Sequence, residues 1–249
     1  MSLTDVGIIM LVSAVGGFVR GVTGMGQNIV AVPLIAIVLN PRDAIVVLVL
    51  ASLLLSIVQM WMYRKYPGDV VQLYRLITLA VVGGIIGSVL LKTIAANVFT
   101  VAIGVLLILY VAIRIRWSQL RVPIELARVL GPCLAFSAGM FQGSLGIGGP
   151  LLAPYLHGTG MIRRTFMFSM AVVFGAVYAI QALAMWKLGM FNRDLVVVGI
   201  TLFIPLALSF YVGTIVGNRV PVATFNRWLL IVFTIMGCQL MLHGFGLVG

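Results

Sequence analysis

GFVRGVTGMGQNIVAVP, which runs from Gly17 to Pro33, is repeated in outline as GMFQGSLGIGGPLLAP from Gly139 to Pro154. A shift of 122 positions superposes four glycines of the first stretch on four of the second, namely Gly17, Gly21, Gly24 and Gly26 on Gly139, Gly143, Gly146 and Gly148. The same shift carries Arg42 onto Arg164, Gln59 onto Gln181 and Lys65 onto Lys187, and a shift of 126 aligns Gly87 with Gly213 and Phe99 with Phe225. Matched polar residues are rare in so apolar a chain, so the sequence predicts two homologous halves, 1–117 and 128–249, joined by a basic linker over 118–127.

Composition places these halves in a membrane. Of the 249 residues, 62% are hydrophobic and only 8% are charged, and the mean hydropathy is +1.21. A soluble domain usually has about a quarter charged residues, so soluble, disordered, fibrous and disulfide-stapled classes are excluded. Because one helical crossing takes roughly 20 apolar residues, the length fits a polytopic, all-α membrane protein with almost nothing left for an extramembrane domain.

Each half has three apolar runs long enough to cross a bilayer as helices. These are 44–62, 73–91 and 98–115 in the first half, and 166–186, 195–216 and 225–242 in the second. A fourth segment in each half, 6–39 and 129–158, is interrupted by glycines and polar residues, and its apolar pieces are too short to cross alone. We therefore expect each half to contain one broken or re-entrant segment and three transmembrane helices.

The distribution of Lys and Arg favours a re-entrant hairpin over a broken full crossing. If the fourth segment crosses, the alternate loops carry 9 and 6 basic residues. If it returns to the side from which it entered, they carry 11 and 4, which fits the positive-inside rule better. The preferred topology is thus a pair of inverted repeats with both termini outside, although a broken crossing can give the same sequence pattern.

The paired breaks point to a ligand. Irregular backbone is tolerated at membrane depth where protein buries it or where it lines a watery cavity, and two breaks in matching places of inverted repeats indicate a transporter's binding site. The helix that restarts after each break offers N–H groups and a positive dipole end to an anion. Small residues also permit close helix packing without any ligand, which is the competing explanation for the glycines.

The ionisable residues define the substrate class. All five carboxylates lie in loops or at segment ends, namely Asp5, Asp43, Asp69, Glu125 and Asp194. Arg20 is the one charge in a membrane-embedded candidate site, and a charge at that depth is usually functional. An arginine can hold an oxyanion through two hydrogen bonds, so the site is expected to select anions. The alternative is that Arg20 extends to the interface or hydrogen-bonds carbonyls of the break.

Further candidates are glycines and polar residues in or near the breaks. In the first break these are Gly24, Gly26, Gln27 and Asn28. Gln59 and Gln181 lie deep in apolar helices at equivalent repeat positions, where they could face the substrate or join helices by hydrogen bonds. His157 follows the second break and could bind the anion or carry a coupling proton, or it could be an ordinary interface residue.

The sequence gives little indication of a disulfide, a metal site or nucleic-acid binding. Cys133 and Cys238 lie in apolar stretches without a CxxC pair or nearby His, so we expect small core residues and no disulfide or metal site. The net charge of +11 is expected to reflect loop topology and not nucleic-acid binding. The first residues lack the basic region of a signal peptide. We expect no metal and no cofactor.

The duplicated pattern G-x-x-x-G-x-x-G-x-G-G, present here as GFVRGVTGMGQ and GMFQGSLGIGG, resembles the TauE/SafE sulfite exporter family, also called the toluene-sulfonate uptake permease family. The resemblance extends over essentially the whole chain. It implies secondary transport of sulfite, organosulfonates or sulfoacetate-like anions across a bacterial inner membrane, with both termini on the periplasmic side in the topology above. It also implies substrate-binding roles for Gln142, Gly143, Ser144, Gly148 and Gly149. The first copy departs from the family pattern at Arg20, Gln27 and Asn28, which puts the particular substrate in doubt.

These observations favour a secondary transporter that exports a small sulfur-containing oxyanion or organosulfonate by alternating access, with the anion held at the two glycine-rich breaks. A proton could be coupled through His157 or through the substrate itself, and the sequence permits a homodimer in the lipid bilayer. A passive anion channel is the alternative. A membrane enzyme is disfavoured because no nucleophile, base and orienting group, and no metal-ligand set, occur together.

Overall fold

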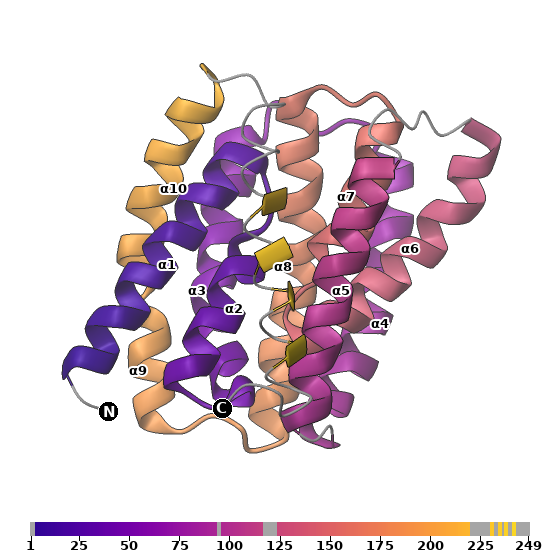
Figure 1. Cartoon of the computed structure of the whole chain (residues 1–249). Coiled ribbons are helices and arrows are strands. Elements are labelled where there is room, and N and C mark those ends of the chain that lie inside the picture. The colour runs from indigo at the N-terminus through magenta and orange to yellow at the C-terminus, as the bar shows by residue number, and fades with distance from the viewer. Residues whose placement is uncertain are drawn as a thin grey trace. The chain divides into compact units, whose positions relative to one another are not determined.

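A computed structural model describes residues 3–93, 96–116 and 124–219, and four residue pairs between 230 and 242. The described residues form helices and no strand (Figure 1). Five of the described helical stretches are long and apolar enough to cross a membrane. The elements are α1 (Leu3–Thr23), α2 (Gln27–Val38), α3 (Pro41–Tyr63), α4 (Val70–Thr93), α5 (Ala96–Arg116), α6 (Ile124–Leu145), α7 (Gly149–Gly158), α8 (Arg163–Lys187), α9 (Arg193–Thr201) and α10 (Phe203–Gly217).

The helices follow the predicted apolar runs with two differences. The run over 195–216 is divided at Leu202 into α9 and α10. The expectation that the first piece of the broken segment is too short to cross is wrong, because α1 continues through Gly16, Gly17 and Gly21 and has 21 residues. Packing of these glycines against a neighbouring helix offsets their weak helix propensity. Most of the predicted helix over 225–242 and most of the linker over 118–127 lie outside the described residues.

Two compact units are present, and they cut across the two halves of the sequence. Unit 1 comprises residues 1–45, 93–118 and 204–249, and unit 2 comprises 46–92 and 119–203. Each unit therefore contains one glycine-rich break together with a helix from the other half. The repeat is an equivalence of sequence, whereas the units are defined by contacts.

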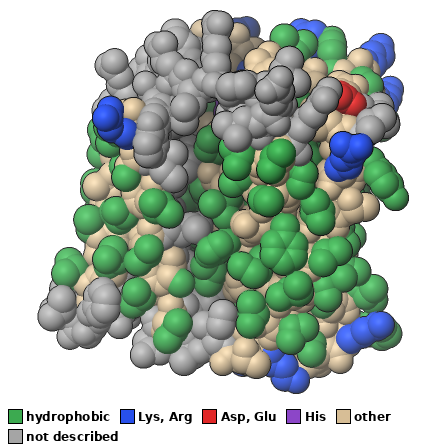
Figure 2. Space-filling model, turned by 90° about the vertical axis from the view of Figure 1, so that its right-hand side faces the viewer, with side chains coloured by type: hydrophobic (Ala, Val, Ile, Leu, Met, Phe, Trp, Pro, Cys, Tyr) green, Lys and Arg blue, Asp and Glu red, His purple; other side chains and the backbone are tan. Residues whose placement is uncertain are grey.

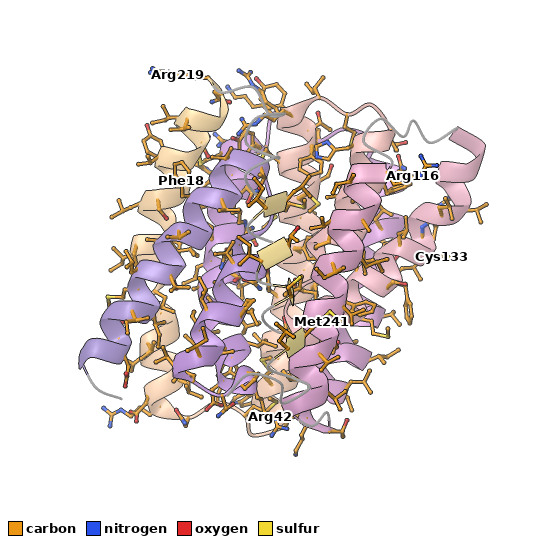
Figure 3. The ribbon with its side chains drawn as sticks, in the orientation of Figure 1. Phe18, Arg42, Arg116, Cys133, Arg219 and Met241 are labelled. Atoms are coloured by element: carbon orange, nitrogen blue, oxygen red, sulfur yellow. The ribbon has the colours of Figure 1, made fainter. Side chains whose placement is uncertain are left out.

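In unit 1, α1 packs against α10 at backbone distance. A methyl group added to Gly17 or Gly21 would fall within 3.0 Å of the carbonyl oxygen of Leu206 or Phe210 respectively. In return, a methyl group on Gly213 would reach the carbonyl of Phe18, which Figure 3 labels on α1. These glycines are needed because no larger residue allows the two backbones to approach so closely.

In unit 2, α6 packs against α4 in the same way. A methyl group on Gly83 or Gly87 of α4 would fall within 3.0 Å of α6 carbonyls, and one on Gly139 or Gly143 of α6 would meet α4 carbonyls. The repeat equivalence extends to individual contacts between these helix pairs. Gly21 faces Phe210 O and Thr214 N, while its equivalent Gly143 faces Gly84 O and Ser88 N, each partner being displaced by 126 positions.

Lateral surfaces of the helices are apolar. Leu11, Ile37, Trp186 and Leu208 are among the many exposed large hydrophobic side chains, and Figure 2 shows such side chains across much of one face, with Lys and Arg near its margins. Surfaces of this kind suit lipid. Cys133 and Cys238 are exposed free cysteines, so the expectation that they are core residues is wrong. In a membrane protein an apolar sequence context marks lipid-facing positions as well as the core.

Candidate functional site

The first break lies between α1 and α2, at Gly24–Gly26. Gly24 and Gly26 have φ values of 85° and 88°, in the left-handed region that glycine adopts without strain. The hydroxyl of Thr23 hydrogen-bonds the carbonyls of Val19 and Met25, at 2.7 and 2.6 Å. After this turn α2 runs back along α1, because a methyl group on Gly16 would lie 3.5 Å from Cβ of Ala31. The two helices therefore form a hairpin within unit 1.

Arg20 reaches across this break. It belongs to the last turn of α1, not to the break as the sequence suggested, and only 4% of its surface is exposed. Its Nη1 donates a hydrogen bond of 3.0 Å to Oε1 of Gln27, in the first turn of α2. Gln27 and Asn28 are both buried. This hydrogen bond to the neutral amide of Gln27 holds the guanidinium in place at the break.

Four of the five carboxylates lie at or just before helix starts in the part of the chain that the structure describes. Asp5, Asp43 and Asp194 are in the first turns of α1, α3 and α9, and Asp69 directly precedes α4. Asp5 is separated from Arg20 by 15 residues of α1, which is roughly 22 Å along the helix axis. A buried arginine held by a neutral amide is suited to a ligand that carries negative charge.

The second break lies between α6 and α7, at Gly146–Gly148. Gly146 has a φ of 73°, and a methyl group on Gly148 would fall within 3.0 Å of both the Ala138 carbonyl and a ring carbon of Phe174. Oε1 of Gln142 accepts a hydrogen bond of 3.1 Å from the backbone N–H of Gly148. Gln142 is the repeat equivalent of Arg20, and it likewise extends from the helix before the break to the start of the helix after it.

Gln181 of α8 is attached to the same place. Its Nε2 donates to the backbone carbonyls of Gln142 and Gly143, at 3.2 Å each. Only 2% of Gln142 and none of Gln181 is exposed. Nε2 of Gln142 and Oε1 of Gln181 are nevertheless buried without a hydrogen-bond partner. One donor and one acceptor are thus unused beside the second break.

The family comparison covers this whole arrangement. The family described as "Sulfite exporter TauE/SafE" matches residues 9–240, a range that contains both breaks and the helices packed against them. The chain belongs to this family. Comparison with curated proteins and with solved structures gave no significant match. The expected resemblance is therefore confirmed, and membership implies a multi-pass membrane transporter of the sulfite or anion exporter type.

The N–H groups at the start of α7 are less available to an anion in this TauE/SafE protein than the sequence led us to expect. The N–H of Gly148 is used by Gln142, and that of Leu151 bonds the Gly148 carbonyl at 3.2 Å. Pro150, next to Gly149 in the first turn, has no N–H. The hydrogen-bonding atoms left without a partner at the second break are therefore those of side-chain amides.

Several predicted site residues make helix-packing contacts in this TauE/SafE chain. Ser144 hydrogen-bonds the Met140 carbonyl of its own helix at 2.8 Å, and its backbone faces Gly87 of α4. Gly143 faces α4 too, so close packing explains it without a ligand. Gln59 donates to the Met167 carbonyl at 2.9 Å and so joins α3 to α8.

His157 is also away from the break. It is exposed in the last turn of α7, roughly 12 Å along the helix from Gly149. Its ring stacks on Phe166, with ring centroids 4.1 Å apart. The structure thus separates His157 from Gln142 and Gln181. In the part of the chain that the structure describes, no group of three His, Cys, Asp or Glu side chains could hold a metal ion.

Sequence reasoning missed two features of the breaks. Phe174, which touches Gly148, carries no motif that would have singled it out. Thr214 of α10 faces Gly21 next to Arg20, and its hydroxyl is buried without a hydrogen-bond partner. The shift of 126 that aligns Gly87 with Gly213 also aligns Ser88 with Thr214, and this pairing could have identified the residue.

Proposed function

We propose that this protein is a secondary transporter that exports a small sulfur-containing oxyanion or organosulfonate, and that each glycine-rich break supplies recognition groups for the anion. The buried guanidinium of Arg20, fixed by Gln27 at the first break, is the observation that carries this proposal. An arginine orders oxyanions through paired, charge-assisted hydrogen bonds. Gln142 and Gln181 add neutral hydrogen-bonding groups at the second break.

The topology that we propose is a pair of inverted repeats, each with a re-entrant hairpin. Two contacts inside unit 2 support it. Arg164 hydrogen-bonds Tyr66, and Nζ of Lys92 lies 3.5 Å from the Leu188 carbonyl. If each break crossed the membrane completely, the two loops in each pair would be on opposite sides of the membrane.

Helix direction also supports this topology. The equivalent helices α3 and α8 run antiparallel, because Gln59 near the end of α3 bonds Met167 near the start of α8, while Ser56 lies beside Gly175 farther along. Equivalent helices of repeats with the same orientation would run the same way. In unit 1, Arg42 lies at one end and Arg116 and Arg219 at the other (Figure 3), in keeping with the predicted division of basic residues between the two sides.

By the positive-inside rule, the side with more arginine and lysine faces the cytoplasm, and we propose that the membrane is a bacterial inner membrane with both termini in the periplasm. We propose alternating access for the transport step. We also propose that transport is coupled to protons and that the protein forms a homodimer. A proton carried by the substrate is favoured over one carried by His157, because His157 is separated from the second break.

Reconstitution in proteoliposomes tests this function. Uptake of radiolabelled sulfite or methanesulfonate into liposomes should saturate with concentration and show counterflow, in which unlabelled anion trapped inside accelerates entry of label. Arg20→Gln should abolish most of the flux. Flux that rises linearly with concentration and lacks counterflow would instead identify an anion channel. Imposed proton and sodium gradients reveal coupling, and the oligomeric state follows from mass measurement in detergent.

A further inference from the structure

The unused donor and acceptor at the second break define what they can bind. Oε1 of Gln142 must face Gly148, because an N–H group needs an acceptor. Nε2 of Gln142 is therefore the donor that remains. Nε2 of Gln181 must face the two carbonyl oxygens of α6, so its Oε1 is the acceptor that remains. These neighbours fix both amide orientations.

Burial makes the pair significant. Both atoms are inaccessible and have no hydrogen-bond partner, and the Phe174 ring and the close approach of Gly148 make the surroundings tight and apolar. A buried polar atom without a partner is unfavourable. The two atoms are of opposite hydrogen-bonding type: one belongs to Gln142 of α6, and the other to the α8 side chain of Gln181, which bonds α6 at Gln142 and Gly143. A ligand group that both accepts and donates would satisfy both atoms.

We infer that the second break recognises a hydroxyl group of the transported anion. Nε2 of Gln142 donates to the hydroxyl oxygen, and the hydroxyl proton is donated to Oε1 of Gln181. An ionised sulfonate or carboxylate has only acceptors and would leave Gln181 unpaired. An ammonium group has only donors and would leave Gln142 unpaired. The inference rests on the proposed anion transport and deepens it.

The hydroxyl could belong to either of two kinds of anion, and binding measurements distinguish between them. It can be carried on carbon, as in 2-hydroxyethanesulfonate, or on the oxyanion itself when that is protonated, as in hydrogensulfite. Calorimetry on the full-length wild-type protein in nanodiscs compares 2-hydroxyethanesulfonate with ethanesulfonate, which lacks only the hydroxyl. A second series follows sulfite affinity from alkaline to acidic pH, with methanesulfonate as the ligand that does not gain a proton.

We expect one of two results. The first is that 2-hydroxyethanesulfonate binds with an affinity roughly ten times that of ethanesulfonate, or higher. The second is that sulfite affinity rises by a similar factor as hydrogensulfite forms, while methanesulfonate affinity stays constant. Equal affinities in both series overturn the inference and leave the proposed anion transport standing. Failure of all these anions to bind overturns the proposed function as well.

Variants of the two glutamines test whether they produce the preference for a hydroxyl-bearing ligand. Gln142→Glu keeps an acceptor for the Gly148 N–H but loses the donor, and Gln181→Leu loses the acceptor, so each should remove the preference for the hydroxyl-bearing ligand. Gln72→Met is the matched control, because Gln72 is an amide of the same unit that hydrogen-bonds Tyr155 of α7. Preference retained in both Gln142→Glu and Gln181→Leu would overturn the assignment. The wild-type ligand comparison stands even where a variant does not fold.

Discussion

Arg20 and Gln142 occupy equivalent positions, 122 residues apart, and each side chain extends from the helix before a glycine break to the first residues of the helix after it. The two contacts have different partners. Arg20 donates to a side chain, whereas Gln142 accepts from the backbone. The first break therefore carries a cation and the second a neutral amide. This difference comes from the side chain at the equivalent position of the repeat.

Arg20→Gln should weaken binding of sulfite or methanesulfonate by roughly 10- to 100-fold, because a hydrogen bond to a charged group contributes about 1.5–3 kcal/mol. Arg20→Lys keeps the charge but loses the paired geometry, so it should bind with intermediate affinity. Calorimetry in nanodiscs measures both. Unchanged affinity in Arg20→Gln would remove Arg20 from the site.

Gln142→Leu should lower the thermal stability of the protein more than Gln142→Glu. Leucine leaves the buried Gly148 N–H without its acceptor, at a cost of about 1–3 kcal/mol, whereas glutamate still accepts that hydrogen bond at the start of α7, where negative charge is favourable. Melting temperatures in detergent provide the comparison. Equal melting temperatures would show that this hydrogen bond does not stabilise the break.

Gly21→Ala and Gly143→Ala should each destabilise the protein, by about 1–3 kcal/mol or more, since the added methyl group collides with the backbone of α10 or α4. Gly7→Ala is the matched control within α1, because a methyl group at that position has no atom within 4 Å apart from its chain neighbours and the nearby backbone of its own helix. Chemical denaturation distinguishes them. Similar stabilities for all three variants would contradict the close approach of these helices.

Gly24→Ala should impair transport, because alanine pays roughly 1–2 kcal/mol in the left-handed conformation. Gly24→Asn should retain more activity, since asparagine tolerates that conformation better. The proteoliposome assay measures both. Wild-type transport by Gly24→Ala would mean that the turn is not constrained.

Cysteine labelling tests the topology. In a background without Cys133 and Cys238, cysteines placed at Tyr66 and Arg164 should both react from the cytoplasmic side with a membrane-impermeant maleimide, and one at Leu188 from the periplasmic side. Reaction of the first two positions from opposite sides would support full crossings at the breaks.

Composition and long apolar runs were enough to predict a helical membrane protein, because these are local signals, and the described residues form helices with five stretches long and apolar enough to cross a membrane. The resemblance to the TauE/SafE family was confirmed. What the sequence could not supply was the direction in which a side chain faces. Ser144 and Gly143 lie in the motif yet face α4, and His157 lies near the break in sequence but far along α7.

Distinguishing Gln59 from Gln181 also required the structure. The two residues are equivalent in the repeat, yet Gln59 joins α3 to α8 while Gln181 bonds the backbone beside the second break. The binding roles of Arg20, Gln142 and Gln181 stay predictions until ligand binding is measured. Burial of the cysteines was predicted wrongly, because hydropathy does not separate lipid-facing residues from the core.

Each glycine-rich helix packs against a helix from the other half of the sequence, and this affects the order in which contacts can form during synthesis. When α6 emerges from the ribosome, its partner α4 has already been made, whereas α1 must await α10, nearly 180 residues later. The glycine face of α1 therefore stays without its final neighbour until translation is almost complete. Chains truncated before residue 203 should consequently retain α4 against α6 but expose the N-terminal hairpin to quality-control proteases.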